Sequence, residues 1–245
     1  MKCVMSDLRR ALCGRWFIIA AVASAIALYM SIGNDTYTMA HMWRHAEEAE
    51  HWHFTLTRLL KKGMLGEFGV MTLPALAALP FAAQPLKDIR CGAIRPAMFR
   101  AGRGAWMLGK ACACMLSGML TQLVAVLMLE AALHAAMLLH EGRLFPSGDM
   151  AELIVPLTAR MLCGGMWACA GCAIALLTGT AAAAYVAPMC LCYALTMIGA
   201  RFFPGIAQLM PINWLTAGLW LPLMLMALLA AAMLLTLRRE VYRYA

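Results

Sequence analysis

Charged residues are scarce in this sequence. Only 13% of the 245 residues are Asp, Glu, Lys or Arg, and just 12 of them are acids. Soluble globular domains carry about twice that charged fraction. Hydrophobic residues make up 64% of the chain, which excludes a disordered chain and argues against an ordinary soluble domain.

Signatures of catalysis are also missing. The HExxH and HxxEH patterns of metallohydrolases are absent, as are EExxxR, a paired Asp set and a His/Ser pair within the apolar runs. The stretch Gly104–Ala111 fits GxxxxGK, but Ala111 stands where a P-loop needs Ser or Thr for Mg²⁺. We therefore expect no enzyme activity and no cofactor in this chain.

What the chain does contain is six apolar stretches. A bilayer core about 30 Å thick is crossed by roughly 20 apolar helical residues. The sequence therefore predicts an all-α polytopic membrane protein forming a single transmembrane domain over residues 1–245. The six expected spans are Trp16–Ile32, Met64–Ala83, Gly104–Leu129, Met161–Leu177, Ala181–Ala200 and Ala217–Leu237, the fourth extended by a turn from Leu153–Ala159.

Charge asymmetry sets the expected orientation. With both termini cytoplasmic, the inner segments hold thirteen basic residues and three acids, whereas the outer segments hold seven basic residues and nine acids. This is the distribution that the positive-inside rule requires. The pI of about 9.1 is therefore attributed to contact with anionic lipid headgroups, and no nucleic-acid partner is expected.

Four segments outside the spans complete the expected organisation. Residues 1–15 predict an amphipathic elbow helix in the membrane interface, because apolar and basic residues occupy different helical faces. Outer loops are expected at 33–63 and 130–152. Residues 201–216 are expected to form an outer re-entrant segment, with a short helix near Ile206–Met210 between two prolines.

The cytoplasmic segment Gln84–Arg103 has the most distinctive pattern. Basic residues and Asp88 alternate with apolar residues at a spacing typical of a short helix, which we expect to break at Pro96. Either the segment anchors the protein to headgroups, or it is a docking helix for a cytoplasmic partner. Asp88 is expected either to pair with a nearby Arg or to project to that partner, and Lys110 to snorkel to the headgroups.

Several residues at fixed spacing carry a resemblance. Leu79-Pro80-Phe81 is followed by Asp88, Gly92, Arg100, Trp106 and Lys110. In this pattern, and in its elbow, six spans and long first outer loop, the chain resembles the permease subunits of bacterial type-2 ABC transporters, relatives of the G-subfamily exporters. Asp88 and Trp106 stand where Glu and Tyr are more usual in that family.

The resemblance implies a function and partners. Residues 84–103 would hold a coupling helix seated on a separate ATP-binding subunit, with Asp88, Arg90, Gly92, Arg95 and Arg100 as coupling residues. Mg-ATP would be bound by that subunit, and a second permease copy, identical or paralogous, would complete the transporter. It also implies a bacterial cytoplasmic membrane location and ATP-driven export. The mostly Ala, Leu and Met spans favour amphipathic, lipid-like or peptide cargo.

On the outer side, two sets of residues are candidates. Glu67, Glu130, Arg160 and Arg201 lie near the outer ends of spans and are expected to form a rim or gate, with Glu130 and Arg160 as a possible pair. His41, His45 and Glu48 have the spacing of a zinc site on one helix face. We nevertheless expect a solvated acidic helix and no metal site here, with a pH-responsive outer cap as a further alternative.

Two further expectations concern the bundle interior. By the family resemblance, spans two and five line the path, which nominates Thr72, Tyr185 and Tyr193. Small residues repeat every four positions along the fourth span (Gly164, Ala168, Cys172) and on the third (Cys114, Gly118), which predicts close helix packing. A non-catalytic scaffold, an immunity protein or a sensor with a His-rich outer loop is the alternative function.

Overall fold

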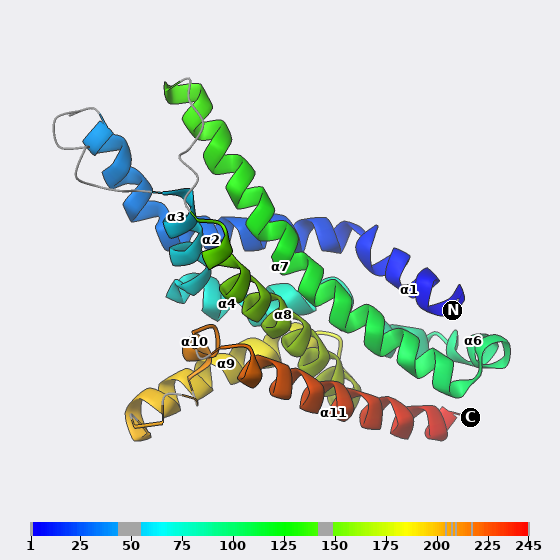
Figure 1. Cartoon of the computed structure of the whole chain (residues 1–245). Coiled ribbons are helices and arrows are strands. Elements are labelled where there is room, and N and C mark those ends of the chain that lie inside the picture. The colour runs from blue at the N-terminus through cyan, green and yellow to red at the C-terminus, as the bar shows by residue number, and fades with distance from the viewer. Residues whose placement is uncertain are drawn as a thin grey trace.

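Helices account for nearly all of the regular structure in the computed structural model of the chain (Figure 1). It describes residues 2–43, 55–141, 149–203, 205, 206, 208, 210–216 and 218–244, and their side chains except those of 2–4, 34–43, 140, 141 and 244. No strand is present in these ranges. The helices are α1 (Lys2–Leu12), α2 (Arg15–Trp43), α3 (Leu56–Leu65), α4 (Glu67–Ala78), α5 (Gln84–Arg90), α6 (Ile94–Ala101), α7 (Arg103–Glu141), α8 (Ala151–Thr178), α9 (Ala183–Phe202), α10 (Pro211–Trp214) and α11 (Trp220–Tyr244).

Five of these helices are long and apolar enough to cross a membrane. They are α2, α7, α8, α9 and α11, and each contains at least 19 residues in its apolar part. Together they make the chain an all-α, multi-pass membrane protein. Many large apolar side chains on α2, α9 and α11 are exposed, as lipid-facing surfaces require.

The second expected span, Met64–Ala83, is not one continuous helix. Gly66 has an extended backbone (ψ 142°) that separates α3 from α4, and α4 has only 12 residues. At 1.5 Å per residue α4 is about 18 Å long, too short to cross alone. The break is stabilised by α2: a Cβ on Gly66 would lie 2.5 Å from the Cβ of Ser31, and the Ser31 hydroxyl accepts the Gly69 N–H at 3.0 Å.

Other helix ends also differ from the expected ones. The first and third spans continue beyond Ile32 and Leu129, so helix occupies the start of both expected outer loops, 33–63 and 130–152. The sequence Glu130–Glu141 is rich in Ala, Leu and Met, which favour helix whether or not lipid surrounds them. The fourth span does include Leu153–Ala159, because α8 begins at Ala151.

In two short segments, the structure differs from the expected position of a turn or of a short helix. The segment Gln84–Arg103 turns at Gly92, which has a left-handed φ of 73°. Pro96 instead lies within the first turn of α6, where its missing N–H removes no helical hydrogen bond. In residues 201–216, the short helix is α10, directly after the expected stretch Ile206–Met210.

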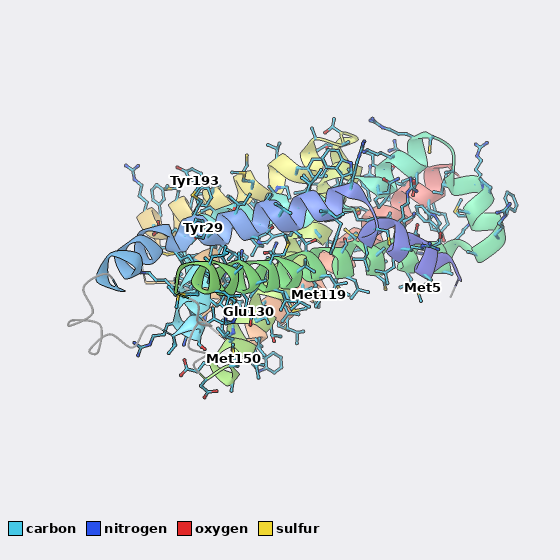
Figure 2. All side chains as sticks on the ribbon, turned by 90° about the horizontal axis from the view of Figure 1, so that it is seen from above. Met5, Tyr29, Met119, Glu130, Met150 and Tyr193 are labelled. Atoms are coloured by element: carbon cyan, nitrogen blue, oxygen red, sulfur yellow. The ribbon has the colours of Figure 1, made fainter. Side chains whose placement is uncertain are left out.

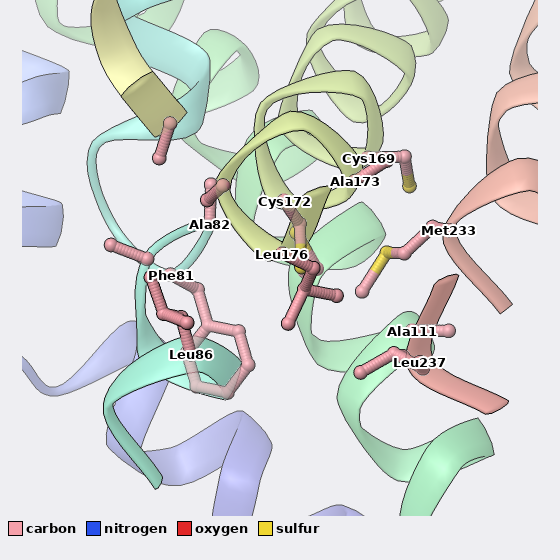
Figure 3. Packing of buried hydrophobic residues seen from close by; sticks show 14 of the residues in the cluster. Phe81, Ala82, Leu86, Ala111, Cys169, Cys172, Ala173, Leu176, Met233 and Leu237 are labelled. Atoms are coloured by element: carbon pink, nitrogen blue, oxygen red, sulfur yellow. The ribbon is translucent and has the colours of Figure 1, made fainter. Parts of the chain in front are cut away.

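Helix α8 lies at the centre of the bundle and contacts α7, α11, α9 and α4. Its approach to α7 is close because Gly118 and Gly164 face each other: a Cβ on Gly118 would lie 2.5 Å from the Gly164 carbonyl oxygen. Figure 3 shows Leu176 and Cys172 of this helix packed between Phe81 and Met233. The small residues of the sequence therefore do serve helix packing.

Both termini lie at one end of the bundle, together with α6, whereas α10 lies away from that end (Figure 1). Seen from above, Met5 lies at the first end and Tyr193 toward the other (Figure 2). The first end therefore collects α1, the α5–α6 segment, the start of α7 and the end of α11.

Candidate functional site: a buried ion cluster joining α1, α5 and α7

Lys110 is the centre of the candidate site. It lies two turns into α7 and is only 3% exposed. Its Nζ atom is 2.6 Å from Asp7 Oδ1 of α1 and 2.6 Å from Asp88 Oδ2 of α5. The expectation that Lys110 snorkels to the headgroups is therefore wrong, since its ammonium group is occupied inside the protein.

Two aromatic rings enclose this ammonium group. The centroids of Phe81 and Trp106 each lie 5.6 Å from Lys110 Nζ, and both side chains are buried. The ring faces attract a cation and keep water away from it. The aromatic residues that carried the sequence resemblance, Phe81 and Trp106, thus line the same site as Asp88 and Lys110.

Asp88 is fully engaged by the cluster. Its Oδ1 atom accepts hydrogen bonds from Arg10 Nη1 at 3.1 Å and from Gln84 Nε2 at 2.9 Å, while Oδ2 binds Lys110. Asp88 therefore pairs with an arginine, as one expectation held, but the arginine comes from α1, 78 residues away. It does not project from the surface of the coupling segment.

The cluster is electrically balanced. Asp7 and Asp88 oppose Lys110 and Arg10, so the four side chains together carry no net charge; Arg10 is the exposed member, and the other three are buried. Removing one member of a buried pair typically costs 3–5 kcal/mol, because the remaining charge is left unpaired. The cluster consequently fixes α1, α5 and the start of α7 relative to one another.

The remaining coupling residues lie on the surface. Arg95, Arg100, Gly92 and Phe99 are exposed, Phe99 by 92%. Arg90, also exposed, donates a hydrogen bond to the carbonyl of Gly179 at the end of α8. The α5–α6 segment therefore has an anchored side, bound to the bundle, and a free side rich in arginine.

Arg160 forms a second polar site, deep in the bundle. It is 1% exposed, and its guanidinium donates to Gln122 Oε1 at 3.1 Å, to the Met64 carbonyl at 2.8 Å and to the Gly69 carbonyl at 3.1 Å. It thus satisfies carbonyl groups on both sides of the α3–α4 break. The expected Glu130–Arg160 pair is wrong, because these groups occupy Arg160 and no ion pair joins it to Glu130.

The structure describes the surroundings of the other predicted residues. Glu67 and Arg201 are exposed, Glu130 is half-buried and Arg160 is buried, and no ion pair among the described residues joins two of these four. Thr72 donates to the Phe68 carbonyl of its own helix, Tyr185 is half-buried and Tyr193 is exposed. The side chains of His41, His45 and Glu48 lie outside the described residues. Among the described residues, no group of three His, Cys, Asp or Glu could hold a metal ion.

Sequence reasoning missed Asp7, Arg10 and Gln84. A signal existed for each: Asp7 is the only acid in a basic helix, Arg10 follows it by three residues, and Gln84 precedes Asp88 by four. Those spacings put side chains on one helix face. The amphipathic interpretation of residues 1–15 instead stressed the apolar face, yet Met5 of that face is 67% exposed and Asp7 is buried.

The charged groups of the cluster are joined to one another by ion pairs, and these pairs connect three helices. Comparisons of the chain with protein-family models, with curated proteins and with solved structures gave no significant match.

Proposed function

We propose that this chain is the membrane-spanning permease subunit of an ATP-driven transporter. The observation that carries the proposal is the buried ion cluster of Asp7, Arg10, Asp88 and Lys110, which joins the α5–α6 segment to two other elements of the bundle. A segment held in this way passes on a push from a cytoplasmic partner as movement of helices. A loosely tethered loop would absorb the same push.

The free side of the α5–α6 segment supplies the surface for such a partner. Phe99 extends into solvent between Arg95 and Arg100. An exposed aromatic residue flanked by arginines is a typical anchor of a protein interface. In the proposed transporter, this surface contacts the ATP-binding subunit, which holds Mg-ATP and hydrolyses it.

The membrane arrangement in the proposal follows from charge and helix length. Both termini and the α5–α6 segment face the cytoplasm, since that end carries most of the basic residues. The broken α3–α4 pair, continued to residue 83, supplies a sixth crossing. Two permease copies and two ATP-binding subunits form the transporter in a bacterial cytoplasmic membrane, and it exports amphipathic, lipid-like or peptide cargo.

The decisive experiment tests the free side of α6 directly. Phe99→Glu places a charge at the proposed interface without disturbing the bundle, because this side chain contacts solvent. We expect the variant to insert and fold normally but to lose co-purification of an ATP-binding subunit and its Mg-dependent hydrolysis. Leu139→Glu is the matched control: it is also exposed and apolar, but it lies 40 residues away on α7.

Asp88→Ala is less informative for docking, since it removes a buried ion-pair partner and threatens the fold. A wild-type chain that purifies alone from its native membrane, with no ATPase partner even in mild detergent, would contradict the transporter proposal. It would favour a scaffold, immunity or sensor role, and attention would move to the His-rich segment after α2.

A further inference from the structure

Two arginines from different helices meet at one tyrosine at the same end of the bundle. The guanidinium carbon of Arg103, the first residue of α7, lies 5.7 Å from the centroid of the Tyr242 ring. That of Arg238, one turn before Tyr242 on α11, lies 5.6 Å from it. We call these three residues the Arg103–Arg238–Tyr242 cluster.

The carboxylates that the structure describes at this end of the bundle pair with other cations. The acids at this end are Asp7, Asp88 and Glu240. Asp7 and Asp88 bind Lys110 and Arg10, and Glu240 accepts Arg243 at 3.2 Å. Among the described residues neither Arg103 nor Arg238 forms an ion pair. Two like charges therefore share one aromatic neighbour, and an anion from outside the protein would relieve their repulsion.

The depth of the cluster indicates which anion is available. The exposed face of α11 is apolar from Leu223 to Leu235, so it faces lipid tails. Arg238 and Tyr242 follow Leu235 by three and seven residues, which at 1.5 Å per residue places them roughly 5 and 10 Å beyond the apolar face. The headgroup layer on each side of a bilayer is about 5–8 Å thick. Arg238 therefore falls at the level of lipid phosphates, with Tyr242 just beyond it.

The chemistry of the side chains fits a phosphate. Guanidinium groups bind phosphate oxygens in a bidentate manner, and tyrosine is enriched at the membrane interface. Stacking against Tyr242 limits the freedom of both arginines, which lowers the entropy lost when a ligand binds.

From these observations, we propose that the Arg103–Arg238–Tyr242 cluster is a binding site for the phosphate headgroup of an anionic phospholipid. The site joins the start of α7 to the end of α11, and it does not depend on whether the chain transports anything.

The test uses the full chain in nanodiscs. Discs of phosphatidylcholine with a small fraction of phosphatidylglycerol are prepared for the wild type, for the double variant Arg103→Gln/Arg238→Gln and for Arg95→Gln/Arg239→Gln. The second pair matches the loss of charge but replaces exposed arginines outside the cluster. Native mass spectrometry then measures the phosphatidylglycerol retained by each protein.

We expect the cluster variant to lose affinity by more than about thirtyfold. Diffuse attraction accounts for about 1 kcal/mol, or about fivefold, for each of two surface arginines, and the cluster adds bidentate contacts with the phosphate. The matched variant should lose clearly less. Equal losses in the two variants would show diffuse attraction and overturn the proposed site. Normal far-ultraviolet circular dichroism of both variants keeps the comparison free of folding defects.

Two further measurements separate other anions from lipid. Displacement of phosphatidylglycerol by millimolar inorganic phosphate, at constant ionic strength, would overturn the lipid assignment in favour of a soluble phosphate. Unchanged lipid retention in the cluster variant, combined with loss of a co-purifying protein, would overturn it in favour of a protein partner. Tyr242→Leu should weaken lipid retention with no change in net charge, which diffuse attraction does not predict.

Discussion

At the scale of single residues, burial decides what a charged side chain does. Lys110 and Arg160 lie in helices that otherwise consist mainly of apolar residues, yet their surroundings differ. Lys110 is neutralised by two carboxylates, whereas Arg160 binds carbonyl and amide oxygens only. The compact ammonium group of a lysine suits a site between two carboxylates. The planar guanidinium group of an arginine, with several donors, suits a site lined by carbonyl and amide oxygens.

Replacing Lys110 by Met should destabilise the protein by about 3–5 kcal/mol, because Asp7 would be left as an unpaired buried charge and Asp88 would keep only Arg10 as a counter-ion. Thermal unfolding in detergent measures the effect. Lys87→Met is the control, since Lys87 is an exposed lysine on α5 and should unfold at nearly the wild-type temperature. Equal stability of the two variants would contradict the cluster as a structural anchor.

Arg160→Lys keeps the positive charge but replaces the planar guanidinium group, with its several N–H donors, by a single ammonium group. One ammonium group cannot reach Gln122 and the carbonyls on both sides of Gly66 with the same geometry. We expect a loss of roughly 2 kcal/mol or more, from the free energy of hydrogen bonds to charged groups. Arg201→Lys, at an exposed position, should change the unfolding temperature little. If both substitutions were neutral, the three hydrogen bonds would have no energetic importance.

At the scale of elements, the distance between neighbouring helices depends on where glycine residues lie. Gly118 of α7 and Gly164 of α8 let the two backbones approach, and Gly66 lets the α3–α4 break lie against α2. The first contact places the central helix α8 against α7, and the second places the α3–α4 break against α2.

Gly118→Ala should therefore separate α7 from α8 and lower the unfolding temperature, since its Cβ would overlap a carbonyl oxygen. Gly104→Ala on the same helix has no atom within 4 Å of the new Cβ. It should be neutral or stabilising by up to about 1 kcal/mol, because Ala favours helix. A reversed order of stabilities would rule out close α7–α8 packing.

At the scale of the whole molecule, the polar sites lie at two different positions along the bundle. The Asp7–Lys110 cluster and the arginines of α6, of the start of α7 and of the end of α11 belong to elements that lie at the end with both termini (Figure 1). Arg160 lies in the interior, where α3 and α4 separate. The proposed docking and lipid sites belong to the first end, so a partner and the headgroups would contact neighbouring surfaces.

Cysteine labelling tests this placement. Cys13, between α1 and α2, and Cys91, between α5 and α6, are both exposed. A membrane-impermeant maleimide should modify both in inverted vesicles and neither in intact cells, as peptide mass spectrometry would show. Cys190 is exposed on the apolar α9 and should stay unmodified from either side, because lipid covers it. Labelling of Cys13 and Cys91 from opposite sides would contradict the arrangement.

Much of the architecture is determined by the sequence alone. Long runs of Ala, Leu and Met have to be helical in lipid, because every backbone polar group must be satisfied within its own segment. The same holds for close helix packing, which Gly164, Ala168 and Gly118 predicted without saying which helices meet. Phe81, Asp88, Trp106 and Lys110 were also singled out, through the family resemblance.

Tertiary structure decided the rest. The break at Gly66 depends on Ser31 and Arg160, which are 35 residues before it and 94 after it, so no local pattern around Gly66 could reveal it. Asp7 and Arg10 belong to the candidate site because α1 packs against α7. The Lys110 side chain points into the protein because it pairs there with two carboxylates. Local preference sets where helices form, but long-range contacts decide how they break and which charges meet.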